Sequence, residues 1–333
     1  MAITIKDIAK KAKVSTTTVS KVLNKKDENI GEETKERVKR IIKEYNYTPN
    51  RLARSLVTKR SQTIGLIIPD VRNPFFTDLV RSVEDLAEEH GYNVFFCNTD
   101  ESLKKEISSI NAMEEKQVEG IVIVPASKID EKVEKRLETN VPIVVIDRDA
   151  EYKNLIGKVL SDNYKGAYQA VNHLINLGHK KIAFISGPVE IKPSVERRKG
   201  FLDACKNNHI DISEKDIYIG SFTLSFGKEI IKKLEDKYSA FFCGNDLIAA
   251  GVIQGLKELN KNVPEDVSII GFDDIPLASM LSPTLTTVRQ DSYNIGLQAA
   301  DILIKYLKNP KKKVKNVSLT THLVKRDSAR KVD

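Results

Sequence analysis

The chain has 333 residues, of which 41% are hydrophobic and 30% are charged, and its formal net charge is +8 at pH 7. No apolar run approaches the ~18–20 residues of a membrane span, and the first residues lack the apolar segment of a signal peptide. These features exclude a membrane protein and favour a cytoplasmic protein built of more than one module.

The cysteines are few and far apart in the sequence. Cys97, Cys205 and Cys243 are odd in number and each is set among apolar residues. This pattern is typical of reduced thiols in a hydrophobic core, and it favours neither a disulfide framework nor a metal site. His179 follows Gly178 at an apparent helix end, where a structural role is expected. We therefore predict no metal and no cofactor.

Residues 4–24, TIKDIAKKAKVSTTTVSKVLN, predict a helix-turn-helix. The first helix has apolar residues at i, i+3, i+4 and i+7, and Thr4 can cap its start. Ser15 can cap a second helix, whose inner face is apolar. Its other face carries small hydroxyls, an amide and a cation, which are side chains suited to reading base edges. These candidate DNA-binding residues are Thr16, Thr17, Ser20, Lys21 and Asn24.

A third helix is expected around residues 38–45, so the head forms a three-helix domain at residues 1–48. A three-helix bundle that binds nothing is the alternative, and the charge distribution argues against it. Residues 1–61 hold 16 Lys and Arg against 7 Asp and Glu, which leaves 38 basic and 39 acidic residues for the rest of the chain. Cations that displace counterions from phosphates are thus concentrated on the head, as in nucleic-acid-binding proteins.

Residues 49–61 predict a hinge. Pro49 ends the third helix, and Asn50 can cap a short segment that contains Arg54 and Leu56. One or two helical turns are unstable alone in water, so this segment is expected to be helical only when docked. Its cations can hold phosphates while the exposed leucine parts a base step, which suits the DNA minor groove.

From residue 63 apolar strands alternate with amphipathic helices, which predicts parallel sheets covered on both faces. The first series has strands at 63–69, 92–98, 120–125 and 141–147, with a helix after the first strand and further helices near 103–116 and 130–138. The second series has strands at 181–187, 216–220, 239–245 and 267–274, with helices at 195–208, 225–236 and 247–259. Two series imply two doubly wound subdomains, which together form an α/β core at residues 62–333. Ligands of such sheets bind beyond the carboxyl ends of the strands.

Polar side chains collect at those strand ends. Asp70 and the segment Asn73-Pro74-Phe75-Phe76 follow the first strand, and Asp147-Arg148 follow the fourth. In the second series, Asn245-Asp246 and Asp273-Asp274 follow neighbouring strands. Carboxylates and amides bind vicinal hydroxyls, and aromatic rings cover the apolar faces of a sugar. Asp and Asn also form ordinary turns, but their recurrence at several strand ends favours a sugar pocket.

No enzyme motif accompanies this pocket. The first strand is not followed by GxGxxG, and the sequence contains no GxxxxGK[ST], HExxH or GxSxG segment. Arg148 beside Asp147 argues against a divalent metal at that point. A sugar-processing enzyme is therefore the least favoured class, and we predict that the chain is not an enzyme.

Several segments together resemble the lactose-repressor (LacI/GalR) family of bacterial transcription regulators: the head, ARSL, IIPDVRNPFF, LGHKKIAFISGP, NVPEDVSIIGFDD and SPTLTTVRQ. The resemblance covers essentially the whole chain. It implies a homodimer whose core is like a periplasmic sugar-binding protein and whose chain crosses three times between subdomains. It implies an N-subdomain of about 62–161 and 290–318, and a C-subdomain of about 162–289 and 319–333. It further implies that Thr16, Thr17 and Lys21 read bases, and that Leu56 is the minor-groove lever.

Within that family the pocket resembles those of ribose repressors and ribose-binding receptors. The matching positions imply ten effector contacts: Asn73, Phe75, Phe76, Asp147, Arg148, Arg197, Phe222, Asn245, Asp273 and Gln290. One position departs from the pattern, because Val124 stands where an asparagine is expected, and this leaves the exact sugar open. Two arginines and two aspartates are neutral together, which suits a neutral sugar better than a sugar phosphate.

Two functions therefore stay open at the level of sequence. The favoured one is a DNA-binding repressor controlled by a small sugar, ribose or a related pentose. The alternative is a regulator of the catabolite-control type, which takes a phosphorylated carrier protein as corepressor. Asp147, Arg148 and Arg197 favour the small ligand.

Overall fold

The computed structural model describes residues 3–24, 26–48, 60–126, 139–234, 237–310 and 316–332. The chain divides into two compact units, Met1–Ser61 and Gln62–Asp333. Within the described residues, no helix is long and apolar enough to cross a membrane.

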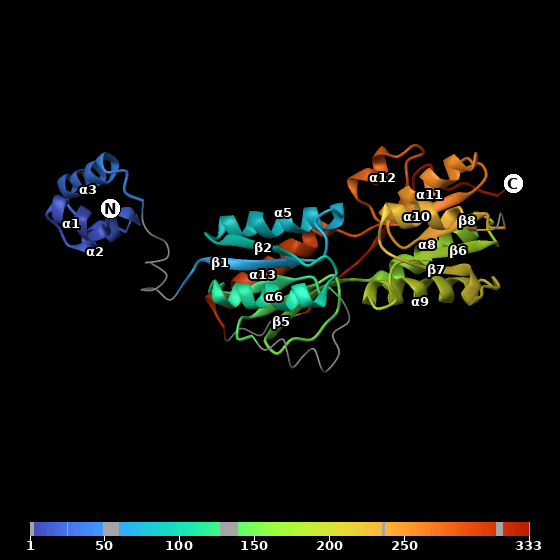
Figure 1. The fold of residues 1–333 in the computed structure, drawn as a ribbon, viewed down its shortest axis with the longest axis horizontal. Coiled ribbons are helices and arrows are strands. Elements are labelled where there is room, and N and C mark those ends of the chain that lie inside the picture. The colour runs from blue at the N-terminus through green and yellow to red at the C-terminus, as the bar shows by residue number, and fades with distance from the viewer. Residues whose placement is uncertain are drawn as a thin grey trace. The chain divides into compact units, whose positions relative to one another are not determined.

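The first unit is a bundle of three helices (Figure 1), namely α1 (Ile5–Ala12), α2 (Thr16–Leu23) and α3 (Glu32–Glu44). Thr4 and Asp7 form a capping box at the start of α1, which satisfies backbone groups that the first turn leaves unpaired. Ser15 caps α2 by accepting a hydrogen bond from the Thr18 amide at 3.1 Å. The helices enclose a small core made of Ile8, Ala9, Ala12, Val19, Val22, Val38 and Ile41. The predicted helix-turn-helix is confirmed.

The second unit contains two six-stranded sheets, which we call the first lobe and the second lobe together with the helices that cover them. The first sheet has the order β11-β5-β4-β3-β1-β2, with β1 (Thr63–Ile68), β2 (Asn93–Asn98), β3 (Ile121–Ile123), β4 (Ile143–Ile146), β5 (Leu155–Ser161) and β11 (Val317–Leu319). The second sheet has the order β12-β10-β9-β8-β6-β7, with β6 (Ile182–Ser186), β7 (Ile217–Ile219), β8 (Ala240–Cys243), β9 (Ser268–Asp273), β10 (Thr286–Arg289) and β12 (His322–Val324).

Helices cover both faces of each sheet (Figure 1). The first lobe contains α5 (Pro74–Glu89), α6 (Leu103–Glu115) and α13 (Ser292–Lys308). The second lobe contains α8 (Asn163–Asn176), α9 (Lys192–Asn207), a short 3-10 helix η1 (Glu214–Asp216), α10 (Leu224–Ile231), α11 (Asp246–Glu258) and α12 (Pro276–Met280). This is the predicted α/β architecture of two doubly wound subdomains.

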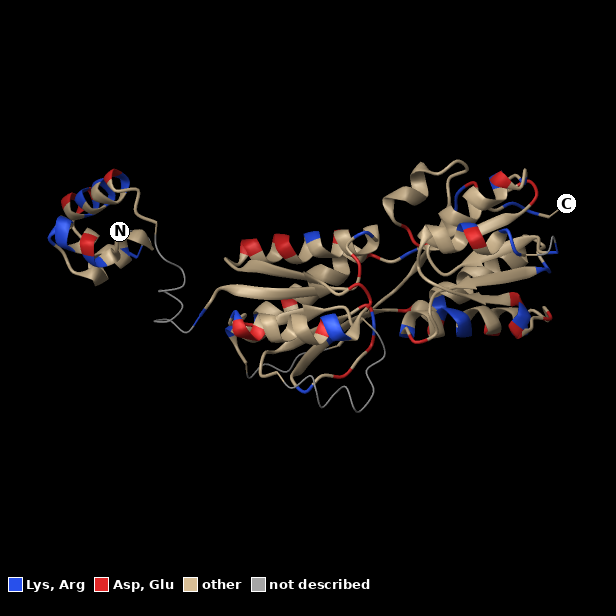
Figure 2. Ribbon diagram, viewed as in Figure 1, with Lys and Arg blue, Asp and Glu red and all other residues tan. Residues whose placement is uncertain are grey.

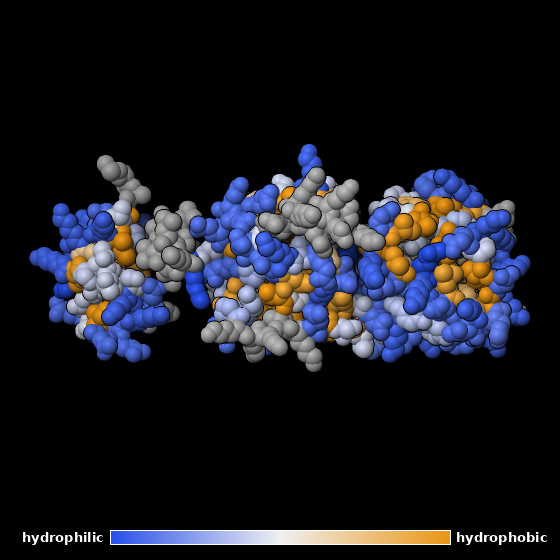
Figure 3. Space-filling model, turned by 90° about the horizontal axis from the view of Figure 1, so that it is seen from below, coloured by the Kyte–Doolittle hydropathy of each residue, from blue (hydrophilic) through white to orange (hydrophobic). Residues whose placement is uncertain are grey.

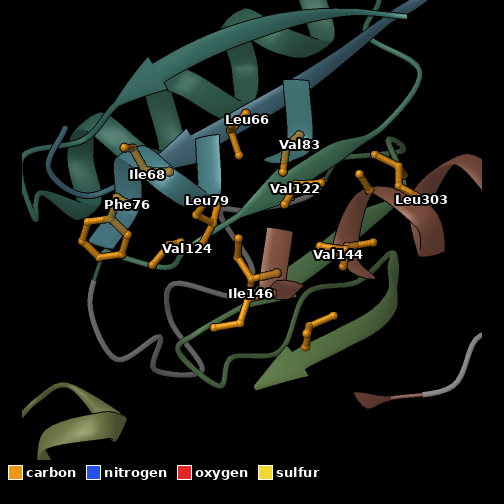
Figure 4. Packing of buried hydrophobic residues seen from close by; sticks show 14 of the residues in the cluster. Leu66, Ile68, Phe76, Leu79, Val83, Val122, Val124, Val144, Ile146 and Leu303 are labelled. Carbon is orange, nitrogen blue, oxygen red and sulfur yellow. The ribbon is translucent and has the colours of Figure 1, made fainter. Parts of the chain in front are cut away.

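The strands are apolar on both sides because each side meets a different helix layer. In β1, Leu66 packs with Val83 of α5 and Leu303 of α13 (Figure 4), whereas Ile67 packs with Met113 of α6 on the opposite face. Burial on both faces explains why the strands are continuous hydrophobic runs. On the surface, hydrophilic residues cover most of the face seen in Figure 3, with smaller hydrophobic patches between them.

The chain passes between the two sheets after β5, after β10, and between β11 and β12. The sequence prediction gave no bounds for β5, α8, β10, α12, α13, β11 and β12. Its second series nevertheless began at β6, the first strand of the second sheet along the chain. The predicted helix near 130–138 lies outside the described residues. The sheets are parallel as predicted, except at one edge, where β12 follows the return from the first lobe and pairs antiparallel with β10.

A glycine sets the distance between α8 and α9. A Cβ on Gly200 would lie 2.4 Å from the carbonyl oxygen of Tyr164 in α8. Arg197 lies one helical turn before Gly200, and its Nε donates to Asn163 Oδ1 at 2.9 Å. The close approach of the two helices therefore fixes the position of the Arg197 guanidinium.

We predict that Gly200→Ala lowers the free energy of unfolding of the core by ~1–3 kcal/mol, because the added methyl group forces α9 away from α8. Urea unfolding of the full chain measures this loss. Lys206→Ala, at an exposed position on the same helix, serves as the control and should change stability by less than ~0.5 kcal/mol. Equal stability of the two variants would contradict the packing explanation.

Candidate functional site

The outer face of α2 carries the candidate DNA-contacting residues. Thr16, Thr17, Lys21 and Asn24 are exposed, and Ser20 is half-buried. The Asn24 amide donates to the Ser20 carbonyl at 2.7 Å, so this side chain is partly used to close the end of the helix. The other three exposed side chains are free to face a groove. Arg54 and Leu56 lie outside the described residues.

A polar constellation lies in a cavity of about 360 Å³ that is lined by residues from both lobes. All ten residues predicted to bind the effector line it: Asn73, Phe75, Phe76, Asp147, Arg148, Arg197, Phe222, Asn245, Asp273 and Gln290. They come together because the strands of each sheet end at the same edge. In Figure 2 acidic segments gather at the strand ends of the first lobe, where the cavity lies.

Two asparagines at the cavity are helix caps. Asn73 begins α5 and its Oδ1 accepts a hydrogen bond from the Phe75 amide at 3.1 Å. Asn245 begins α11 and its Oδ1 accepts from the Ile248 amide at 2.9 Å. The caps fix both side chains and consume their carbonyl oxygens, which leaves the NH₂ groups as the donors that a ligand can meet.

Aromatic rings form the apolar part of the cavity wall. Phe75 and Phe76 are buried and meet edge to face, with their ring centroids 5.2 Å apart. Phe222 contributes a ring from the second lobe, whose centroid lies 5.9 Å from the Arg197 guanidinium carbon. Rings from both lobes can thus cover the C–H faces of a bound sugar.

Arg148 is 5% exposed and is surrounded by acceptors. Its two terminal nitrogens donate to the Glu101 carboxylate at 2.5 and 2.8 Å, and one of them also donates to the carbonyls of Pro125 and Ala126. Its Nε lies 3.7 Å from Asp147 Oδ2. Burial raises the pKa of the Asp147 carboxyl, and the charge of Arg148 opposes that shift. Glu101 was not among the predicted site residues.

Arg197 lies on the opposite wall. Its guanidinium carbon is 3.7 Å from the centroid of the Phe272 ring, and it donates to the Gly244 carbonyl and to Asp273 Oδ1. Gln290 Nε2 donates to the same Asp273 oxygen at 2.8 Å. Burial raises the pKa of the Asp273 carboxyl to about 7, although Arg197 and Gln290 act in the opposite direction.

Two polar atoms of this cavity lack partners. Arg148 Nε and Gln290 Oε1 are buried, and neither forms a hydrogen bond with any described residue. One is a donor that follows β4 of the first sheet, and the other is an acceptor that directly follows β10 of the second sheet. An unsatisfied buried polar atom costs about 1–3 kcal/mol, so a ligand that supplies hydroxyl groups would recover that cost.

Val124, which departs from the expected asparagine, does not line the cavity. Its side chain is buried with Leu79 and Ile146 in the core of the first lobe (Figure 4). The position therefore contributes packing in this chain. His179 is also structural, as expected, since its ring nitrogens contact the Ser239 hydroxyl and the Arg330 carbonyl at 3.0 and 3.1 Å.

The head and the core each match a known family. Residues 4–50 match the family described as bacterial regulatory proteins, lacI family, and residues 171–329 match the periplasmic binding protein-like domain. The chain is 37% identical to the ribose operon repressor of Halalkalibacterium halodurans, over 98% of this chain and 97% of that protein. This chain belongs to the LacI family. It is also 38% identical to the catabolite control protein A of Priestia megaterium, over 92% of this chain and 93% of that protein. Both relatives are regulators and neither is an enzyme.

Solved LacI-family structures share the fold. The lac repressor dimer bound to operator and the anti-inducer ONPF superposes with a TM-score of 0.86 at 26% identity, over 99% of this chain and 100% of that one. A LacI-family regulator from Enterococcus faecium with bound ribose gives a TM-score of 0.72 at 29% identity, over 81% of this chain and 100% of that one.

The raised pKa of Asp273 predicts a pH-dependent effect of Asp273→Asn. The folded wild type holds the Asp273 proton more tightly than the unfolded chain, so the stability that this carboxyl contributes is complete below about pH 4 and is lost as the pH rises through 7. Asparagine does not titrate. We expect the stability of the variant relative to wild type to rise between about pH 5 and about pH 8, by at most ~1.4 kcal/mol per pH unit. Urea unfolding across this range tests it, and a difference that stays constant with pH would contradict it.

Proposed function

We propose that this LacI-family chain is a sequence-specific transcriptional repressor whose operator affinity is controlled by a small neutral sugar, ribose or a closely related pentose. The observation that carries the proposal is the pair of buried, unpartnered atoms, Arg148 Nε and Gln290 Oε1, on opposite walls of one cavity. A hydroxyl group is both donor and acceptor, so neighbouring hydroxyls on one ring can satisfy both atoms. The ribose operon repressor among its relatives and the ribose-bound structure support this choice of sugar.

The remaining cavity residues fit the same ligand. The carboxylates of Asp147 and Asp273 accept hydrogen bonds from hydroxyls, the Asn73 and Asn245 amides donate to them, and the aromatic rings cover the ring carbons. Val124 leaves one expected hydrogen bond unmade, and for this reason the proposal extends to other pentoses.

DNA recognition is assigned to the head. Thr16, Thr17 and Lys21 on α2 face outward, and the excess of Lys and Arg in residues 1–61 supplies phosphate contacts. We propose a homodimer that places one such helix in each half of a pseudo-palindromic operator. Acting on bacterial operator DNA, the protein would work in the cytoplasm.

Ligand and DNA binding are coupled through the two lobes. We assign the head to residues 1–48, the hinge to 49–61, the N-subdomain to about 62–161 and 290–318, and the C-subdomain to about 162–289 and 319–333. A ligand held by residues from both subdomains draws them together. In a dimer that closure changes the spacing of the two hinges, and so lowers operator affinity through one bistable interface.

Regulation by a phosphorylated carrier protein is the second candidate, since the catabolite control protein A of Priestia megaterium is as similar in sequence as the ribose operon repressor. The buried, unpartnered atoms of the cavity favour the small ligand. The experiment that follows separates the two.

We predict that D-ribose weakens operator binding by a coupling free energy of ~1–3 kcal/mol. Operator DNA is first selected from a random library with the full-length protein, and binding is then titrated with and without ribose. Arg148→Ala should abolish the sugar response and keep sugar-free DNA binding nearly unchanged, because Arg148 lies in the core. Arg81→Ala is the control, since that arginine is exposed on α5, pairs with Asp85 and does not line the cavity. If no free sugar shifts wild-type affinity but a phosphorylated carrier protein does, the ribose assignment fails.

For the head we predict that Lys21→Ala lowers the binding free energy for the operator by ~1–3 kcal/mol, and that the loss depends on the identity of one base pair if this side chain reads that base. Binding to a panel of single-base variants of the selected operator measures the cost. Lys39→Ala on α3 is a charge-matched control, since Lys39 forms an ion pair with Glu36 on its own helix. Uniform weakening on every sequence would show that Lys21 contacts phosphate only.

A further inference from the structure

We propose that Glu101 determines the specificity of this pocket: it orients Arg148 toward neutral hydroxyl groups and excludes phosphorylated sugars. The inference rests on the proposed function and goes beyond it, because it states which form of the sugar the pocket accepts and which residue decides. Glu101 follows β2 and lies outside the set of residues expected from the sequence.

Hydrogen bonds to Glu101 fix the orientation of the Arg148 guanidinium. Its terminal nitrogens, Nη1 and Nη2, both donate to Glu101, so the carboxylate occupies the end of the group. On the side edge, formed by Nε and the second hydrogen of Nη2, Nε is buried, has no hydrogen-bond partner among the described residues, and lies 3.7 Å from Asp147 Oδ2. A planar, bidentate pair fixes orientation as well as charge. Glu101 accepts one N–H from each terminal nitrogen, and the carbonyls of Pro125 and Ala126 accept from Nη1 as well. The donors that remain for a ligand are Nε–H and one N–H of Nη2.

The loop that carries Glu101 is held in place by its neighbours. Asp100 and Glu101 both adopt left-handed backbone conformations, with φ of 51° and 58°, which side-chain-bearing residues rarely do. Asn98 donates to Asp100 Oδ1 at 2.6 Å, and Lys105 forms an ion pair with the same residue. Ser102 then begins α6 as its cap. These contacts aim the Glu101 side chain at Arg148 before any ligand arrives.

The charged residues of the cavity lining also disfavour a phosphate group. The cavity lining contains six carboxylates against three guanidinium groups: Asp70, Asp100, Glu101, Asp147, Glu190 and Asp273 against Arg72, Arg148 and Arg197. The two arginines and two aspartates expected from the sequence are neutral together, and the other charged residues of the lining add net negative charge. Each guanidinium already has a carboxylate partner, Asp70, Glu101 or Asp273. A phosphate group entering the described lining meets excess negative charge and three guanidinium groups that already have carboxylate partners, so its own charge is repelled.

Glu101 places one of these negative charges directly on the Arg148 guanidinium. Arg148 is buried in the wall that the first lobe contributes to the cavity, and a phosphate would need to displace Glu101 to reach the end of its guanidinium. A hydroxyl needs only the side edge, where Nε has no hydrogen-bond partner among the described residues. The same carboxylate therefore admits a neutral polyol and rejects its phosphate ester.

The test compares matched pairs of ligands, D-ribose with ribose 5-phosphate and glucose with glucose 6-phosphate, by calorimetry on the full-length protein. Glu101→Gln keeps an oxygen that accepts from Arg148 but removes the charge. We expect ribose affinity within about threefold of wild type and an increase of about tenfold or more in affinity for ribose 5-phosphate. Glu101→Ala should bind ribose about tenfold more weakly than wild type, because Arg148 is no longer held in one orientation. Glu84→Gln, an exposed residue on α5, is the control for net charge and should behave as wild type.

Each other outcome overturns a defined part of the account. If wild type binds ribose 5-phosphate as well as ribose, or if Glu101→Gln discriminates as wild type does, the specificity role of Glu101 is wrong while sugar binding stands. A gain of ribose affinity in Glu101→Ala would show that Glu101 competes with the ligand, and would also overturn the role. If wild type binds neither D-ribose nor glucose, the proposed sugar-responsive function is wrong, and the role of Glu101, which depends on it, is wrong as well. Thermal unfolding without ligand shows that the variants fold.

Discussion

The arrangement of the core depends on two guanidinium groups that are buried between its lobes. Removing an ion from water costs several kcal/mol, so Arg148 and Arg197 need carboxylates beside them. Those carboxylates stand directly after strands: Asp147 follows β4, and Asp273 ends β9. Both have positive φ angles, 62° and 113°, so the backbone turns sharply where each strand ends and aims its carboxylate at the cavity. The need to pair buried guanidinium groups thus explains the backbone conformation at Asp147 and Asp273.

The same requirement explains how the core can be both rigid and movable. Each sheet is packed between apolar helix layers and behaves as a unit, whereas the joint between the lobes is polar and is crossed by the chain after β5, after β10 and between β11 and β12. Apolar packing resists deformation, while polar groups can exchange one partner for another. A ligand that supplies partners to both walls can therefore shift the balance between two arrangements of the lobes. In the proposed dimer this balance is what the DNA-binding head would sense.

Much of this was accessible from the sequence, and the failures have physical causes. Continuous apolar runs predicted β1, β6 and β9, and the polar residues after such strands predicted the cavity lining, because parallel strands end at one edge. Elements with a mixed pattern, such as β5 and α13, were missed, and the antiparallel pairing of β12 depends on a return from the other lobe that local sequence does not encode. Glu101 lies in the loop after β2, which was not among the strand ends assigned to the pocket, and local sequence does not show that its carboxylate reaches Arg148. Only the fold shows that Arg148, 47 residues away along the chain, is its partner.

The central claim is that a ligand held by both walls closes the core. Val71 and Val189 lie beside opposite lips of the cavity, each 45% exposed, and neither lines it. Spin labels at these positions, in a Cys97→Ala background, report the separation of the lobes by pulsed electron resonance. The account predicts that ribose shortens this distance in the otherwise wild-type protein and leaves it unchanged in Arg148→Ala. Ribose binding with no change in the distance between the labels would contradict it.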